Sequence, residues 1–324
     1  MFILVYGEDA YRLREKEQEL RVAFSQKFDA VKCNEAVFEI AKSGKILDTI
    51  GQALSAPPFL AEKRLVVLRG VFGAVKKEEI EDWVHVFSRA TSSTICLFVE
   101  ESPCATVEKH ALYKAISPLF GERKYTFPIL AGRFLTDWLS SWSQINKAVL
   151  SNDALYTLID RVGADSWRLT REIKKLQAFC GDAAITKREI EEMVVPSEEG
   201  AMFECMDAIA TKSPRAWQKL LDERESGTND VFIFSMLVRQ VRLMSLARLK
   251  LNEDPKCTKQ NLADELSIHP FVAGKLLMQA GKFSSEDLTR LERRLSFFDE
   301  RMKTGVMKPD MAVYTAVATL LQTK

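Results

Sequence analysis

Short runs of apolar residues alternate with segments of helical periodicity in the first part of the chain, to about residue 130. Continuous apolar runs are typical of strands covered on both faces, as in a parallel sheet. Such runs predict strands at residues 2–6, 65–68, 95–99 and 125–127, with residues 30–33 as a weaker fifth. Helical spacers, such as residues 11–24, supply the crossovers. The pattern therefore predicts an α/β domain with a parallel sheet.

Strand patterns nearly vanish after Pro128, and apolar residues then recur at helical spacing. The stripes comprise Leu135, Trp138, Leu139 and Trp142, then Leu155, Leu158, Ile159 and Val162, then Leu169, Ile173 and Leu176. Gly163 suits a helix C-cap, and Thr186 with Glu189 forms a capping box that opens a short helix before Pro196. This part predicts a compact domain of roughly three helices.

Residues 197–200 are interpreted as a linker or loop, beyond which the chain is predicted to be helical to its end. Ser213 and Pro214 suit an N-cap followed by proline at the first helical position. One long helix is expected over residues 229–250. Another begins at Ser284, with its buried face made of Leu288, Leu291, Leu295, Phe298 and Met302. The predicted domains are 1–139 (α/β), 140–207 (small helical) and 208–324 (all helical).

Composition describes an ordinary globular protein: 324 residues, of which 47% are hydrophobic and 28% charged. The 46 Lys and Arg residues nearly balance the 45 Asp and Glu residues, so no overall field favours nucleic acid or a membrane. No apolar run is long enough for a transmembrane helix. The six cysteines show no metal-ligand spacing and suit reduced thiols, so a cytoplasmic location without a metal site is expected.

The first strand is followed by Gly7, Glu8 and Asp9, and the chain contains no G-x-x-x-x-G-K-[ST] phosphate loop. Two carboxylates therefore occupy the place where a nucleotide phosphate would bind. The run from Cys96 to Glu101 resembles a magnesium-positioning strand end, but without a phosphate loop a solvated strand end is the favoured interpretation. No histidine has a neighbour suited to nucleophilic catalysis. The sequence thus indicates no catalytic residue and no cofactor.

Phe59 and Leu60 follow the proline pair Pro57-Pro58 and precede three charged residues. The prolines fix φ at two positions, so the two apolar side chains lie on a constrained turn. Such residues are either buried beneath the sheet or presented to a partner, and taken alone the pair favours the core.

Arg239, Arg242 and Lys250 share one face of the predicted long helix. A solvated face with i,i+4 partners is the favoured interpretation. Contacts to DNA phosphates or to another subunit are the alternatives.

Several segments, in order and spacing, carry a resemblance to a known family. They are YGED at residues 6–9, PFLAEKRLVV at 58–67, VGADSWRL at 162–169, EIKKL at 172–176, LVRQVR at 237–242 and IHPFVAGK at 268–275. Together they resemble the delta subunits of bacterial DNA polymerase III clamp loaders.

The resemblance implies an AAA+-like α/β domain with a degenerate nucleotide site, a helical lid and a C-terminal helical collar for oligomerisation. It implies a non-catalytic subunit of the DNA polymerase holoenzyme that binds and opens the sliding clamp. The implied partners are the clamp (beta subunit), the ATPase gamma/tau subunits, the delta-prime subunit and primed DNA. Phe59 and Leu60 occupy the family's clamp-binding place.

Two other functions stay open. The first is an ATP-driven AAA+ enzyme with a divergent nucleotide site, which would bind ATP as an isolated chain. The second is a stand-alone DNA-binding repair factor that uses the basic helices, whose DNA affinity would fall steeply with salt. The near-neutral charge disfavours the second function.

Overall fold

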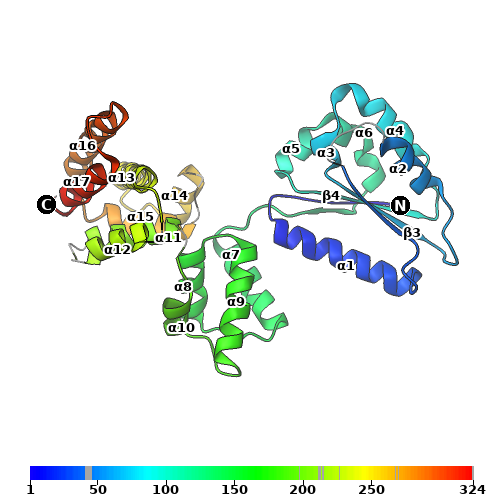
Figure 1. Ribbon diagram of the computed structural model, residues 1–324, viewed down its shortest axis with the longest axis horizontal. Helices are drawn as coiled ribbons and strands as arrows, with labels where there is room; N and C mark the ends of the chain where they lie inside the picture. Colours follow the sequence, from blue (N-terminus) through cyan, green and yellow to red (C-terminus); the bar gives the residue numbers. More distant parts are fainter. Residues whose placement is uncertain are drawn as a thin grey trace. The chain divides into compact units, whose positions relative to one another are not determined.

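The computed structural model describes the backbone of residues 1–40, 46–196, 198–210, 213, 215–225, 227–266, 268 and 270–322. The chain divides into two compact units (Figure 1). The first comprises Met1–Leu130 together with Asp165–Trp167, and the second comprises Ala131–Ala164 together with Arg168–Lys324.

A five-stranded parallel sheet, in the order β2-β3-β4-β1-β5, forms the centre of the first unit. Its strands are β1 (Phe2–Tyr6), β2 (Glu35–Glu39), β3 (Arg64–Arg69), β4 (Thr94–Glu100) and β5 (Lys124–Thr126). The α/β prediction and four of the five predicted strands are thereby confirmed. The helical remainder confirms the predicted fold class.

The weaker fifth strand, predicted at residues 30–33, is wrong. Those residues form a turn after the first helix, and the strand is β2, Glu35–Glu39. Exposed and half-buried residues alternate along β2, because this edge strand is only partly covered. An edge strand of this kind has no continuous apolar run, so the criterion that found the central strands missed it.

Helices cover both faces of the sheet (Figure 1), and alternate strand residues point to different cores. Val5, Val67 and Leu97 pack beneath α1, whereas Leu4 and Phe98 pack against the helices of the other face. The elements of this unit between the strands are α1 (Ala10–Phe28), α2 (Ile46–Ser55), α3 (Val71–Ala74), η1 (Lys77–Glu79), α4 (Ile80–Ser88), α5 (Cys104–Lys109) and α6 (Ala111–Phe120).

The remaining helices are α7 (Gly132–Ile145), α8 (Asn152–Val162), α9 (Ser166–Cys180), α10 (Lys187–Met193), α11 (Glu198–Ala210), α12 (Arg215–Glu225), α13 (Asp230–Glu253), α14 (Lys259–Leu266), α15 (Pro270–Ala280), α16 (Ser285–Lys303) and α17 (Pro309–Gln322). The predicted capping box of Thr186 and Glu189 is present, and Gly163 ends α8 with a positive φ of 82°. The linker predicted at 197–200 is wrong from residue 198 onward, because α11 begins there. Residue 197 and Pro214 lie outside the described residues.

Helix α13 runs through the core of the second unit, with Leu237, Val241 and Met244 fully buried. Helices α15, α16 and α17 pack around it. The predicted apolar face of α16 is buried from Leu288 to Phe298, and Met302 is partly buried. The division of the helical part into lid and collar domains stays a prediction.

Among the described residues, no helix combines the length and apolar character needed to cross a bilayer.

Candidate functional site

Phe59 and Leu60 form an exposed pair, hereafter the knob, on the loop between α2 and β3. The Phe59 side chain is 66% exposed and that of Leu60 is 92% exposed. The interpretation favoured by the pair alone, a place in the core, is therefore wrong. Because β3 begins directly after this loop, the knob lies at the amino edge of the parallel sheet.

The backbone of the knob is bound by the side chain of Asn34. The Phe59 N–H donates to Asn34 Oδ1 at 2.6 Å, and Asn34 Nδ2 donates to the Phe59 carbonyl at 2.9 Å. The Asn34 amide thus makes two hydrogen bonds to one residue, as an adjacent strand would. Asn34 itself is 2% exposed and lies just before β2.

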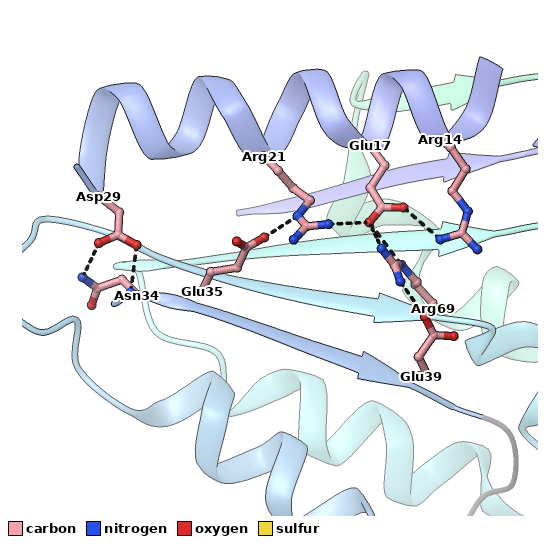
Figure 2. A network of polar contacts seen from close by, with 8 residues as sticks. All are labelled: Arg14, Glu17, Arg21, Asp29, Asn34, Glu35, Glu39 and Arg69. Atoms are coloured by element: carbon pink, nitrogen blue, oxygen red, sulfur yellow. Dashed lines mark hydrogen bonds and ion pairs between the residues drawn. The ribbon is translucent and has the colours of Figure 1, made fainter. Parts of the chain in front are cut away.

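Asp29 holds Asn34 in turn (Figure 2). Asn34 Nδ2 donates to Asp29 Oδ1 at 3.0 Å, and the Asn34 N–H donates to Asp29 Oδ2 at 2.8 Å. The Cys33 N–H adds a third bond to Oδ1 at 3.1 Å. Burial alone would raise the pKa of Asp29, but these hydrogen bonds outweigh it and hold the pKa below its ordinary value.

Two loop residues beside this pair have left-handed backbone conformations that non-glycine residues rarely adopt. Leu60 has φ of 50° and Lys32 has φ of 58°. Such conformations cost about 1 kcal/mol each or more and persist where the surroundings enforce them. Asn34 binds the backbone of Phe59, next to Leu60, and Asp29 accepts from the N–H of Cys33, next to Lys32. Hydrogen bonds therefore hold the backbone beside each of these two residues.

A cleft of about 270 Å³ separates the knob from the turn that follows α1. Its lining includes Phe28, Val31 and Cys33 on one side and Phe59 and Leu60 on the other. Val31 is 81% exposed, so the apolar surface around the knob extends across the cleft.

Replacing Asp29 with asparagine is expected to reduce stability near neutral pH and to have little effect in acid. A lowered folded-state pKa adds stability above the ordinary carboxyl pKa, and this stability is lost as pH falls through the folded value. The difference in unfolding free energy between the wild type and Asp29→Asn should therefore shrink below about pH 4. Urea unfolding over a pH series measures it. A difference that persists undiminished at low pH would contradict the assigned role of the carboxylate.

A second polar network lies between α1 and the sheet (Figure 2). The buried Glu17 carboxylate of α1 is paired with Arg14, Arg21 and Arg69, the last at 2.5 Å from β3. Arg21 and Arg69 are also paired with Glu35 and Glu39 at the two ends of β2. This network ties α1 to the two strands that flank the knob.

The loop after β1, where a nucleotide phosphate would bind, is occupied by the protein's own groups. The Gly7 N–H donates to the Glu100 carbonyl at 3.1 Å, and the Asp9 N–H donates to the Phe127 carbonyl at 3.0 Å. A Cβ on Gly7 would lie 2.1 Å from the Phe127 carbonyl oxygen, so the loop and the β5 end are in close contact. The Asp9 carboxylate caps α1 by accepting from the Arg12 N–H at 3.2 Å. An anion of the chain therefore takes the phosphate's place.

Glu100 corrects the interpretation of residues 96–101 as a solvated strand end. It is 3% exposed, and its carboxylate accepts from the Phe72 N–H at 2.9 Å and from Ser102 Oγ at 3.1 Å. Burial raises the pKa of Glu100. Its carboxylate thus anchors the start of α3, whereas the next residue, Glu101, is exposed.

Replacing Asp9 with alanine is expected to lower the unfolding free energy by about 1 kcal/mol, because α1 loses its N-cap. Chemical denaturation measures this loss. Glu8→Ala is the matched control, since Glu8 is exposed in the same loop and should change stability by less than about 0.5 kcal/mol. Equal losses in the two variants would contradict the capping role.

Arg239 and Arg242 are exposed on α13, in the second unit. Lys250, on the same helix, is paired with Glu265 at 2.9 Å and with Glu253 at 3.3 Å. Lys250 thus has acidic partners, but at i,i+3 and on α14 rather than at the expected i,i+4 spacing. Within the described ranges, no group of three or more His, Cys, Asp or Glu side chains could hold a metal ion.

No role was expected for Asn34 or Asp29 from the sequence. The available signal was an aspartate at the end of an amphipathic helix followed by an asparagine before a strand, since both residue types bind nearby backbone groups in turns. That pattern is common, and the contact with Phe59, 25 residues away, has no sequence signature.

Comparison with known proteins adds evidence on the family. Residues 199–320 match the family model for the C-terminal domain of the DNA polymerase III delta subunit. The DNA polymerase III subunit delta of Bacillus subtilis is 26% identical over 316 residues, covering 93% of this chain and 87% of the relative.

A solved structure agrees with the fold of the chain. The Bacillus subtilis DNA clamp loader delta protein aligns with a TM-score of 0.62 at 22% identity, covering 99% of this chain and 95% of that one. The delta-subunit resemblance noted in the sequence is thus confirmed, and the fold is shared over almost the whole chain. The knob lies outside the residues that match the family model.

Proposed function

We propose that this chain acts in DNA replication as the delta subunit of a bacterial clamp loader. In that role it binds and opens the sliding clamp for loading onto primed DNA, as a non-catalytic part of the polymerase III holoenzyme. The similarity to delta subunits supports the proposal. The observation that carries it is an exposed apolar pair on a loop held by hydrogen bonds, in a domain whose phosphate position is filled.

The knob supplies the binding free energy in this proposal. Burying Phe59 and Leu60 in an apolar pocket of the clamp is worth roughly 1.5–3 kcal/mol for each side chain. Binding can open a ring only if the knob fits the open form better than the closed form. The fit to the distorted clamp, rather than affinity alone, is therefore the proposed basis of opening.

The other partners follow from the same proposal. ATP is used by the neighbouring gamma/tau subunits, which with delta-prime complete the loader in the cytoplasm. Residues 1–139 form the clamp-contacting AAA+-like domain, residues 140–207 the lid and residues 208–324 the collar. Arg239 and Arg242 contact primed DNA or a neighbouring subunit, and their exposure on α13 is consistent with either role.

Equilibrium binding to a purified bacterial sliding clamp tests the proposal. We expect saturable binding of the isolated chain to the clamp, measured by surface plasmon resonance, and co-purification with gamma/tau and delta-prime. Absence of any clamp binding by the folded chain would overturn the assignment.

Two further measurements separate the rival functions. Micromolar binding of labelled ATP to the isolated chain would favour a divergent ATPase, and the occupied loop after β1 predicts none. Tight DNA binding by the chain alone, weakening steeply with salt, would favour a repair factor. The net charge of +1 predicts that such binding is weak.

A further inference from the structure

The buried side chains of Asp29 and Asn34 connect two loops at the amino edge of the sheet. We propose that this pair, hereafter the latch, holds the knob in its docking conformation before the partner arrives. Asn34 and Asp29 are then positioning residues, which act through Phe59 and Leu60 without touching the partner. The inference rests on the proposed function, because it concerns how the same knob is presented.

The hydrogen bonds of Asn34 leave no alternative orientation of its amide. The Asp29 carboxylate only accepts, so Nδ2 must face it, and the Phe59 N–H only donates, so Oδ1 must face that group. The second Nδ2 hydrogen reaches the Phe59 carbonyl. The backbone of Asn34 is also engaged, because its carbonyl accepts from the Leu65 N–H at 2.9 Å. Every polar group of Asn34 thus has a partner.

Burial strengthens this arrangement. Asp29 is 4% exposed and Asn34 is 2% exposed, so water competes poorly for their hydrogen bonds. Asp29 is itself held at the end of α1, where its N–H donates to the Ser25 carbonyl at 3.1 Å. The latch therefore connects the knob to the body of the domain through a helix end.

The strained backbone of the knob indicates what the latch does. Leu60 has a left-handed φ of 50° directly after the latched residue, and its side chain is 92% exposed. Because the Leu60 side chain is exposed, its own packing does not enforce this conformation. The two hydrogen bonds to Phe59 fix the residue before it, and the proline pair fixes the backbone upstream.

Holding the knob in advance affects binding through entropy. A loop that is already ordered loses less conformational freedom when the partner binds, so its affinity is higher for the same contacts. Without the latch, residues 59 and 60 would have to be ordered during association. We expect Asn34→Ala to weaken clamp binding by about tenfold, with Phe59 and Leu60 both still present.

Amide hydrogen exchange of the full chain gives a direct readout of the latch. In the wild type, the Phe59 amide is expected to be protected, because it donates to Asn34 Oδ1. In Asn34→Ala this protection should be lost, while the amides of β3 and β4 keep theirs. A wild-type Phe59 amide that exchanges at the rate of an unstructured peptide would overturn the proposal.

Clamp affinity is then measured for Asn34→Ala beside a control that weakens the same domain elsewhere. Glu17→Gln serves this purpose, because Glu17 is buried in the network of α1 and does not contact the knob. We expect Glu17→Gln to reduce the melting temperature and to keep wild-type affinity, whereas Asn34→Ala loses affinity. Equal affinity of Asn34→Ala and the wild type, or an equal loss in Glu17→Gln, would overturn the proposal.

A milder variant covers the case in which Asn34→Ala does not fold. Asp29→Asn keeps the size of the side chain and removes the charge that orients Asn34, so affinity should fall about threefold. The alanine double variant of Phe59 and Leu60 distinguishes a failure of the knob's proposed function from a failure of the latch alone. If that variant binds the clamp normally, the proposed function of the knob fails. If it loses binding while Asn34→Ala and Asp29→Asn do not, only the latch fails.

Discussion

Replacing Phe59 and Leu60 together by alanine is expected to weaken binding to the sliding clamp by about a thousandfold. Each truncation at a contact that is buried in the complex typically costs about 2 kcal/mol or more, and 1.4 kcal/mol corresponds to a factor of ten. Folding should be unaffected, because the two side chains are 66% and 92% exposed in the isolated chain. Surface plasmon resonance against immobilised clamp measures the affinity, and circular dichroism verifies the fold.

A second exposed apolar pair provides the matched control. Phe134 is 75% exposed and Ile145 is 80% exposed, both on α7. Their replacement by alanine removes similar apolar area from the surface and should leave clamp affinity within twofold of the wild type, or about 0.4 kcal/mol. If both double variants lose affinity alike, the effect is general surface hydrophobicity and the knob is not a specific contact.

Replacing Glu17 by alanine is expected to lower the unfolding free energy of the first unit by about 3 kcal/mol. Removal of one member of a buried ionic network leaves its partners uncompensated, which typically costs about 3–5 kcal/mol. Arg14, Arg21 and Arg69 would then lose the shared carboxylate, although Arg21 and Arg69 keep their pairs with Glu35 and Glu39. The lower end of the range is expected here, since the arginines are 20–41% exposed at their side chains.

Urea unfolding monitored by tryptophan fluorescence measures this change, because Trp83 is fully buried in the same unit. Glu19→Ala is the control on the same helix. Glu19 is 64% exposed and pairs with Lys16, so its removal should cost less than about 1 kcal/mol. A loss in Glu17→Ala no larger than that in Glu19→Ala would show that the network does not stabilise the unit.

The central strands and most helices could be predicted from sequence because local patterns specify them. Strands β3 and β4 are buried on both faces, so their apolar runs are continuous. Helix α16 has a capping box at its start, followed directly by an apolar stripe at helical spacing. Edge strand β2 was missed because its covering is partial. The start of α11 was interpreted as a linker because its first three residues are two glutamates and a glycine.

The candidate site was predictable in part. The proline pair marked the turn that carries Phe59 and Leu60, but residue type alone favoured the core over exposure. Exposure depends on whether other parts of the chain cover the loop, which no local pattern records. The buried state of Glu100 was missed for the same reason, since its partner Phe72 lies 28 residues away.

The order of strands has a consequence for how the protein is made. Within the described residues, strand β1 pairs with β4 and β5, and its paired residues lie 94 and 120 positions further along the chain. A nascent chain leaving the ribosome therefore carries an apolar β1 that has no neighbour until residues 94–126 have been synthesised. Such non-local pairing slows folding and leaves strand edges open to aggregation. Early binding of chaperones to the newly made N-terminal segment is expected to determine the yield of folded protein.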